Sequence, residues 1–344
     1  MPIKQSWLVP PNTEGQTMIS FIRSMNPALD KGHILKAAKN KDIRINGQRI
    51  RTDMPVASGD EIVCFWPDNL ADRLIEASAE SKASPKLDRY YQIVYSDEDL
   101  IVINKAPGIS VHSDRHSQAG EPDLLTMIRN SMQDSRIELC HRLDRNTSGL
   151  LLLARTQAVH ALLTALIREH SIRKLYQCLA KGLPPDASDD ANWHQITGWL
   201  EKDADAGNVY IHEKRQPGDK KITTRYRLIR HWPDLGPDGS GISHLEVELV
   251  TGRTHQIRAH LAAVGCPLLG DGKYGRNSFN QSFHDSRGRT IKRQQLTASS
   301  ITLPDLQTLK EAAAGIREHK YTEALLAKLA DRSFRIEPDF DIRL

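Results

Sequence analysis

Cysteines, aromatic residues and long apolar runs are all scarce in this 344-residue chain. The cysteines, Cys64, Cys140, Cys178 and Cys266, lie far apart, so neither a disulfide framework nor a clustered zinc site is indicated. The longest apolar stretch, residues 150–154, is too short to span a bilayer. The N-terminus lacks the charged start and apolar core of a signal peptide. We therefore expect a reduced, cytoplasmic protein.

A strong excess of charge is also missing. The formal net charge is only +4, so overall charge predicts no nucleic-acid partner, and any RNA binding must depend on local clusters. With 39% hydrophobic and 26% charged residues, the composition is typical of a soluble globular protein. The length predicts two or three domains of roughly 150 residues each.

The chain near its N-terminus has the pattern of a small α/β domain over residues 12–67. Asn46-Gly47 separates two short alternating stretches and predicts a hairpin, because both residues tolerate the positive φ of a tight turn. Residues 68–88, rich in Ala, Ser and charge, are predicted to be a linker. The expected helices are 18–26 and 32–40, and the expected strands are 43–45, 48–50 and 61–65.

This small domain carries a basic cluster. Seven Lys or Arg residues lie between Lys31 and Arg51, against one acid, Asp42. Such a run is usually a solvated face, but it can also bind RNA phosphates. The candidate RNA-binding residues are Lys31, Lys36, Lys39, Arg44 and Arg49.

From residue 89 to residue 304, strand patterns alternate with helical ones, which favours the α+β class with a mixed, mainly antiparallel sheet flanked by helices. The clearest helix follows Arg155, with Thr156 as its N-cap and an apolar stripe facing the core. Residues 305–344 are predicted to be a helical C-terminal extension, with one or two amphipathic helices between 306 and 331. The expected strands are 92–95, 100–104, 150–154, 176–181, 224–229 and 244–250.

Residues 141–155 are the most informative segment of the chain. They read His-Arg-Leu-Asp, then Arg-Asn-Thr-Ser-Gly, then an apolar strand. Asp144 thus stands among arginines in a polar, turn-rich loop. A surface ion pair is the ordinary explanation for such an acid, and a chemical role is the alternative.

Two further motifs follow. Residues 251–261 read Thr-Gly-Arg-Thr-His-Gln-Ile-Arg-Ala-His-Leu, and 173–176 read Arg-Lys-Leu-Tyr. Taken alone, the first could be a solvated helix start, and the tyrosine could simply pack. A spacing of five between His255 and His260 suits a shared metal poorly, so we expect no metal site.

Together these motifs resemble those of the RluA-type pseudouridine synthases, which isomerise uridine within RNA. The basic N-terminal segment resembles the S-four-type RNA-binding domain that many of them carry, slightly more as in the RluC than in the RluD type. In this reaction the bond from ribose to the base nitrogen breaks, and the sugar rejoins the base at carbon five. Since no group is lost and no redox change occurs, neither cofactor nor metal is expected. The chain departs from the family where Ala106 replaces a proline and where residues 296–298 lack a histidine.

The resemblance implies the roles of individual residues. Asp144 would be the nucleophile, Arg258 would pair with it and Tyr176 would lie against the target base. Burial disfavours an ionised carboxyl group and a nearby arginine favours it, so a partner such as Arg258 is expected. Arg142 would fill the stack when the uridine is flipped out; alternatively it merely pairs with Asp144. Further substrate-binding candidates are His141, Arg253 and His255.

The two-domain members of the family imply large-subunit ribosomal RNA as the partner of a monomer that does not bind a membrane. Two other functions compete with this one. A non-catalytic RNA-binding ribosome-assembly factor on the same fold would be expected to have lost part of the Asp, Tyr and Arg set, which is present. A protein kinase would need a Gly-rich phosphate loop and an Asp-Phe-Gly string, which are not found.

Overall fold

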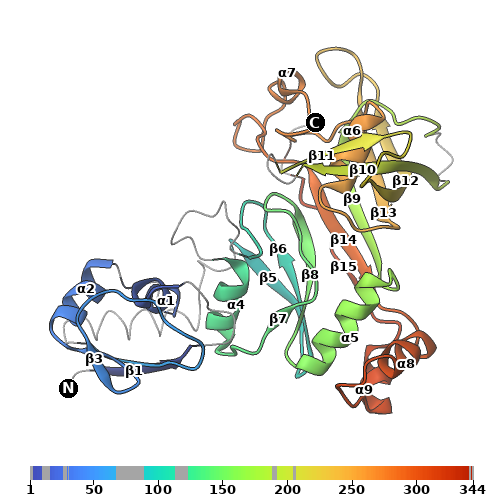
Figure 1. Ribbon diagram of the computed structural model, residues 1–344. Helices are drawn as coiled ribbons and strands as arrows, with labels where there is room; N and C mark the ends of the chain where they lie inside the picture. The colour runs from blue at the N-terminus through green and yellow to red at the C-terminus, as the bar shows by residue number, and fades with distance from the viewer. Residues whose placement is uncertain are drawn as a thin grey trace. The chain divides into compact units, whose positions relative to one another are not determined.

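The computed structural model describes residues 3–9, 16–25, 29, 31–66, 89–112, 123–187, 192–203, 207–340 and 342 (Figure 1). The chain divides into two compact units, one spanning Met1–Asp88 with His112–Arg136 and the other Arg89–Val111 with Ile137–Leu344. The predicted linker, 68–88, lies outside the described residues. The predicted division into domains, at 12–67, 89–304 and 305–344, stays a prediction.

The first unit contains a four-stranded sheet of order β1-β4-β2-β3 with two helices packed on it. Asn46 and Gly47 have φ of 50° and 78°, which confirms the predicted hairpin turn. The first strand, which pairs with β4 along its whole length, was not predicted. The elements are β1 (Ile3–Leu8), α1 (Met18–Met25), α2 (Lys31–Lys39), β2 (Ile43–Ile45), β3 (Gln48–Ile50), β4 (Glu61–Trp66) and α4 (Leu124–Met132).

The second unit is built on an 11-stranded sheet whose main path runs β11-β10-β12-β13-β9-β14-β8-β6-β5. Every pairing in it is antiparallel except that of β8 with β14, so the predicted α+β class with a mixed, mainly antiparallel sheet is confirmed. The strands are β5 (Tyr91–Ser96), β6 (Leu100–Lys105), β7 (Glu138–Leu139), β8 (Ser148–Ala154), β9 (Arg173–Lys181), β10 (His194–Asp203), β11 (Asn208–His212), β12 (Lys220–Trp232), β13 (Ile242–Leu249), β14 (Leu296–Thr302) and β15 (Ser333–Arg335).

The core of this unit lies under the apolar strand β8. Helix α5 (Gln157–Arg168) begins as predicted, because the Thr156 hydroxyl accepts the N–H of Val159. Its apolar stripe packs with β6, β8 and the C-terminal helices (Figure 1). The predicted amphipathic helices of the C-terminal segment are α8 (Leu306–Ala314) and α9 (Glu323–Leu329), and the smaller helices are α6 (Gln256–Ala263) and α7 (Asn277–Asn280).

The junction of β8 with β14 positions the loop before β8. Thr297 pairs with Ser148 and Ala298 with Gly149. Gly149 has a φ of +112°, and a Cβ there would lie 2.4 Å from backbone atoms of Ala298. Only glycine permits this close approach, which places the end of the Asp144 loop against the middle of the sheet.

Candidate active site

Asp144 lies in the loop that joins β7 to β8, with its side chain 24% exposed. Its backbone carbonyl accepts the N–H of Thr147 (3.1 Å), which closes a turn. The Thr147 hydroxyl accepts from the buried amide of Gln294 (2.8 Å), a residue just before β14. The loop is thereby fixed on two sides while its carboxylate stays accessible.

Lys105, at the end of β6, also fixes this loop by hydrogen bonds. Its side chain is fully buried, and Nζ donates to the carbonyls of Ala106 (2.8 Å), Ile109 (3.1 Å) and Arg145 (3.0 Å). Burial lowers the pKa of Lys105 to about 7, although the carboxylate of Asp144 acts in the opposite direction. The lysine therefore ties the residue after Asp144 to the turn that follows β6.

Arg258, in the first turn of α6, brings two carboxylates together. Its Nη1 donates a hydrogen bond to Asp144 Oδ2 (3.1 Å), while its Nε and Nη2 donate to the two carboxylate oxygens of Asp271 (2.7 and 3.0 Å). Asp271 is 1% exposed, and its burial would raise its pKa, but the hydrogen bonds and charge of Arg258 outweigh this and lower it. Burial likewise disfavours the charged guanidinium, yet the two carboxylates raise the pKa of Arg258. Arg258 is thus a fixed, buried cation aimed at Asp144.

His255 and Tyr274 complete this side of the site. The Nε2 of His255 lies 3.8 Å from Asp144 Oδ2, and its Nδ1 lies 2.9 Å from the Tyr274 hydroxyl. Burial lowers the pKa of His255, so the ring is neutral near pH 7. The ring of Tyr274 stacks near the guanidinium of Arg258, with 5.1 Å from Cζ to the ring centroid.

Tyr176 lies on β9, beside β14, with 6% of its surface exposed. Burial, together with the nearby carboxylate of Asp144, raises the pKa of its hydroxyl. The hydroxyl therefore stays protonated at neutral pH, and the side chain offers an aromatic ring and a hydrogen-bond donor rather than a phenolate.

The other predicted substrate contacts differ in exposure. Arg142 and Arg253 are exposed to solvent. Among the described residues the ion partners of Asp144 are Arg258 and His255, so Arg142 is not paired with it. The Nε2 of His141 accepts the backbone N–H of Leu152 (3.1 Å), and burial lowers the pKa of this ring to about 3.

The basic candidates of the first unit lie on helix α2 and on the hairpin of β2 and β3. Lys31, Lys36 and Lys39 are exposed on α2. On the hairpin, Arg44 and Arg49 stand directly opposite each other on β2 and β3, an arrangement in which like charges repel.

His255 and His260 do not form a metal site. His260, which the sequence placed near His255, is buried and shares a hydrogen bond with the Thr224 hydroxyl (2.9 Å). Within the described part of the chain, donor atoms of Glu201, His212 and Asp219 come close enough to hold an ion. However, His212 Nδ1 already lies 3.0 Å from Asp219, so a histidine–carboxylate pair accounts for the cluster.

Three residues of the site were not assigned roles from the sequence: Lys105, Asp271 and Tyr274. The only available signals were an isolated lysine ending an apolar strand and an acid in the Gly-Asp-Gly string after the second motif. Neither signal shows which side chain is buried against which, because the contacts join segments far apart in the chain.

Residues 99–263 match the family model described as RNA pseudouridylate synthase. These residues include Asp144, Tyr176 and Arg258 on the elements described above. This match confirms the resemblance to RNA pseudouridine synthases inferred from the motifs, and with it the isomerase activity that the resemblance implies.

Several similar proteins share one name, ribosomal large subunit pseudouridine synthase C. The protein of Vibrio vulnificus (strain CMCP6) is 27% identical over 77% of this chain and 78% of its own length. The Salmonella typhi protein is 29% identical over 83% of this chain and 84% of its own. Among solved structures, human RNA pseudouridylate synthase domain containing 1 matches with a TM-score of 0.49 and 24% identity, covering 64% of this chain and 81% of that one.

Proposed function

We propose that this chain converts specific uridines of large-subunit ribosomal RNA to pseudouridine, with Asp144 as the nucleophile. The bond from ribose C1′ to base N1 breaks, C1′ bonds to C5, the C5 proton leaves and N1 takes up a proton. Atoms and electrons balance within the nucleotide and its proton exchange, so the reaction requires no cofactor or metal.

One observation carries this proposal: Arg258 joins the accessible Asp144 to the buried Asp271. A fixed cation 3.1 Å from Oδ2 of Asp144 would hold the carboxylate in one position for attack. A surface ion pair would need neither the burial of Arg258 nor a second carboxylate behind it.

The remaining roles follow from exposure. Tyr176 would press its ring against the base and donate a hydrogen bond, as its raised pKa favours. Arg142, exposed and not paired with Asp144, would fill the space in the RNA that the flipped uridine leaves. His141, Arg253 and His255 would contact the substrate around Asp144.

The basic residues of α2 and of the hairpin would anchor the RNA. The repulsion between Arg44 and Arg49 in the free protein would be relieved by phosphates, which favours an anionic partner. The names of the similar proteins support large-subunit ribosomal RNA as this partner. Such a target places the enzyme in the cytoplasm, where we propose that it acts as a monomer. No helix among the described residues is long and apolar enough to cross a membrane.

Pseudouridine mapping of total RNA tests this function. Carbodiimide labelling and primer extension would be applied to cells lacking the gene, complemented with wild type or with Asp144→Asn. We expect defined large-subunit sites to disappear on deletion and to return only with wild type. Restoration of these sites by Asp144→Asn, or normal sites in the deletion strain, would contradict the proposal.

Binding distinguishes an isomerase from the non-catalytic alternative. Asp144→Asn should retain its affinity for large-subunit ribosomal RNA while losing all activity. A variant that loses binding as well would show that Asp144 supports the loop rather than the chemistry. An inactive wild-type protein that binds the RNA tightly would favour the assembly factor.

A further inference from the structure

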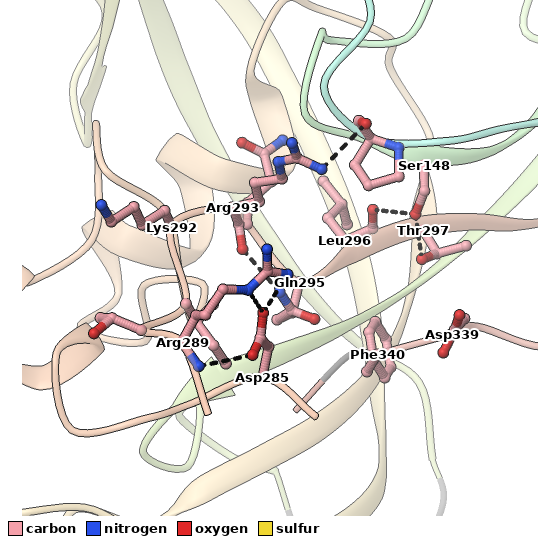
Figure 2. A pocket seen from close by; sticks show the side chains of 14 residues that line it. Ser148, Asp285, Arg289, Lys292, Arg293, Gln295, Leu296, Thr297, Asp339 and Phe340 are labelled. Carbon is pink, nitrogen blue, oxygen red and sulfur yellow. Dashed lines mark hydrogen bonds and ion pairs between the residues drawn. The ribbon is translucent and has the colours of Figure 1, made fainter. Parts of the chain in front are cut away.

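A cavity lies beside the catalytic loop, between the start of β14, the segment before it and the C-terminal residues Asp339 and Phe340 (Figure 2). Its volume of 560 Å³ falls within the range of pockets that hold small ligands, about 300–1,000 Å³. The catalytic groups Asp144, Tyr176 and Arg258 do not line it.

The lining of the cavity has an excess of positive charge. Arg289 is neutralised by Asp285, with contacts of 2.7 and 2.8 Å. Among the described residues, Lys292 and Arg293 have no carboxylate partner. The guanidinium of Arg293 only donates to the carbonyl of Pro107 (3.4 Å). Two cations are therefore available to an anionic group, opposite the single exposed carboxylate of Asp339.

The cavity also offers one aromatic ring and an amide. The ring of Phe340 contacts His244 edge-on, with 5.4 Å between centroids and an interplanar angle of 87°, and it lines the cavity. Gln295 projects into the same space, with its Nε2 donating to the carbonyl of Arg293 (2.8 Å). An aromatic surface beside cations and an amide is the combination that binds a splayed-out nucleotide, by stacking its base and pairing with its phosphate.

The cavity is joined directly to the catalytic loop. Ser148 and Thr297 share a hydrogen bond of 2.8 Å in its wall, and Gln294 bonds the Thr147 hydroxyl. Ser148 is only four residues from Asp144, at most about 14 Å along the chain. A strand of RNA whose uridine reaches Asp144 can therefore place a neighbouring nucleotide here.

We propose that this cavity binds a second, unstacked nucleotide of the substrate RNA, close in sequence to the target uridine. Its base lies on Phe340 and its phosphate pairs with Arg293 and Lys292, while Asp339 accepts from a ribose hydroxyl. This inference rests on the proposed function. It explains how the enzyme selects a uridine by its surroundings, since the catalytic groups contact only the uridine itself.

Kinetics on a transcript of full-length large-subunit ribosomal RNA test the stacking contact. Phe340→Ala should lower kcat/KM about tenfold, chiefly through KM, and Phe340→Tyr should restore it. Tyr210→Ala, an exposed aromatic change on β11, is the matched control and should have no effect. Arg293→Gln should reduce the slope of log affinity against log salt by about one. An unchanged kcat/KM for Phe340→Ala, together with an unchanged salt slope for Arg293→Gln, would overturn the proposal.

Cross-linking identifies the nucleotide. A photoreactive benzoylphenylalanine at position 340, in the Asp144→Asn background, should give one primer-extension stop within a few nucleotides of the modified uridine. Scattered stops, no RNA adduct, or protection of position 340 by uridine 5′-monophosphate alone would contradict the RNA subsite. If this inference is wrong but the proposed function is right, the wild-type protein still forms pseudouridine. If the proposed function is wrong, the wild-type protein forms none.

Discussion

Asp271 should be worth more to the stability of the fold than Asp144, although both pair with Arg258. The carboxylate of Asp271 is buried and accepts two hydrogen bonds from Arg258 and two from the backbone N–H groups of Lys273 and Tyr274. In Asp271→Asn the NH2 group is best placed at Oδ2, where it faces Arg258 Nε, so one charge-assisted bond is lost and the buried Arg258 loses a counter-charge. Removing one charge of a buried ion pair costs about 3–5 kcal/mol.

Asp144→Asn is the matched control. It makes the same chemical change in a side chain that is 24% exposed and accepts one hydrogen bond from Arg258. We expect a loss of about 1 kcal/mol, because the amide oxygen can still accept. Urea denaturation followed by tryptophan fluorescence compares the two free energies of unfolding.

The stabilisation by Asp271 should depend on pH. The pKa of Asp271 is lowered in the folded state, so its stabilisation is present above the ordinary aspartate pKa, near 3.8, and is lost as the pH falls through the lower folded value. The difference between wild type and Asp271→Asn should therefore shrink only below about pH 4. In activity, Asp271→Asn keeps the nucleophile but misplaces Arg258, for which we expect a loss of about 100-fold. Equal stability losses for the two variants would refute the reasoning.

Three other predictions concern separate parts of the molecule. The wild-type protein should lose stability as the pH falls from about 6.5 toward 3, because His141 has a folded pKa of about 3 and is protonated only on unfolding. In His141→Gln, the slope of unfolding free energy against pH, measured by urea denaturation at several pH values, should be smaller by up to about 1.4 kcal/mol per pH unit. Neutralising Lys36, Lys39 and Arg44 together to Gln should lower the salt slope of RNA affinity by about two in filter binding, and an unchanged slope would exclude this surface as the anchor. Lys328 forms ion pairs of 2.5–3.1 Å with Asp97, Glu98 and Asp99, so Lys328→Gln should speed amide hydrogen exchange in α9 about two- to fivefold and leave exchange in β8 unchanged. If α9 exchanges at the same rate in the variant and in wild type, apolar packing alone stabilises the helix.

Local signals made much of the fold predictable. The Asn46-Gly47 turn and the Thr156 cap each depend on a few neighbouring residues, and both are present as expected. Strand β1 was missed because its pairing with β4 joins residues about sixty positions apart, as Trp7 with Ile62. Its own six residues alternate too weakly to indicate a strand without that partner.

The candidate site divides in the same way. Asp144, Tyr176 and Arg258 were found because short motifs carry them, and the structure brings all three to one sheet region. Lys105 and Asp271 act through burial, and burial is a property of the assembled sheet. No short string shows that the ammonium of Lys105 will reach the carbonyl of Arg145, forty residues further on.

The parallel pairing of β8 with β14 limits how early the sheet can be completed during translation. Ser148 must wait for Thr297, 149 residues later, before its strand gains this neighbour. At 5–20 residues per second, the ribosome takes roughly 7 to 30 s to deliver it. During that interval Ser148 and Gly149 lack this neighbour, whereas Leu153 and Ala154 already pair with β6 on one side and β7 on the other. The end of the Asp144 loop is therefore not fixed against the sheet, and the nascent chain should have no activity, until Thr297 has been translated.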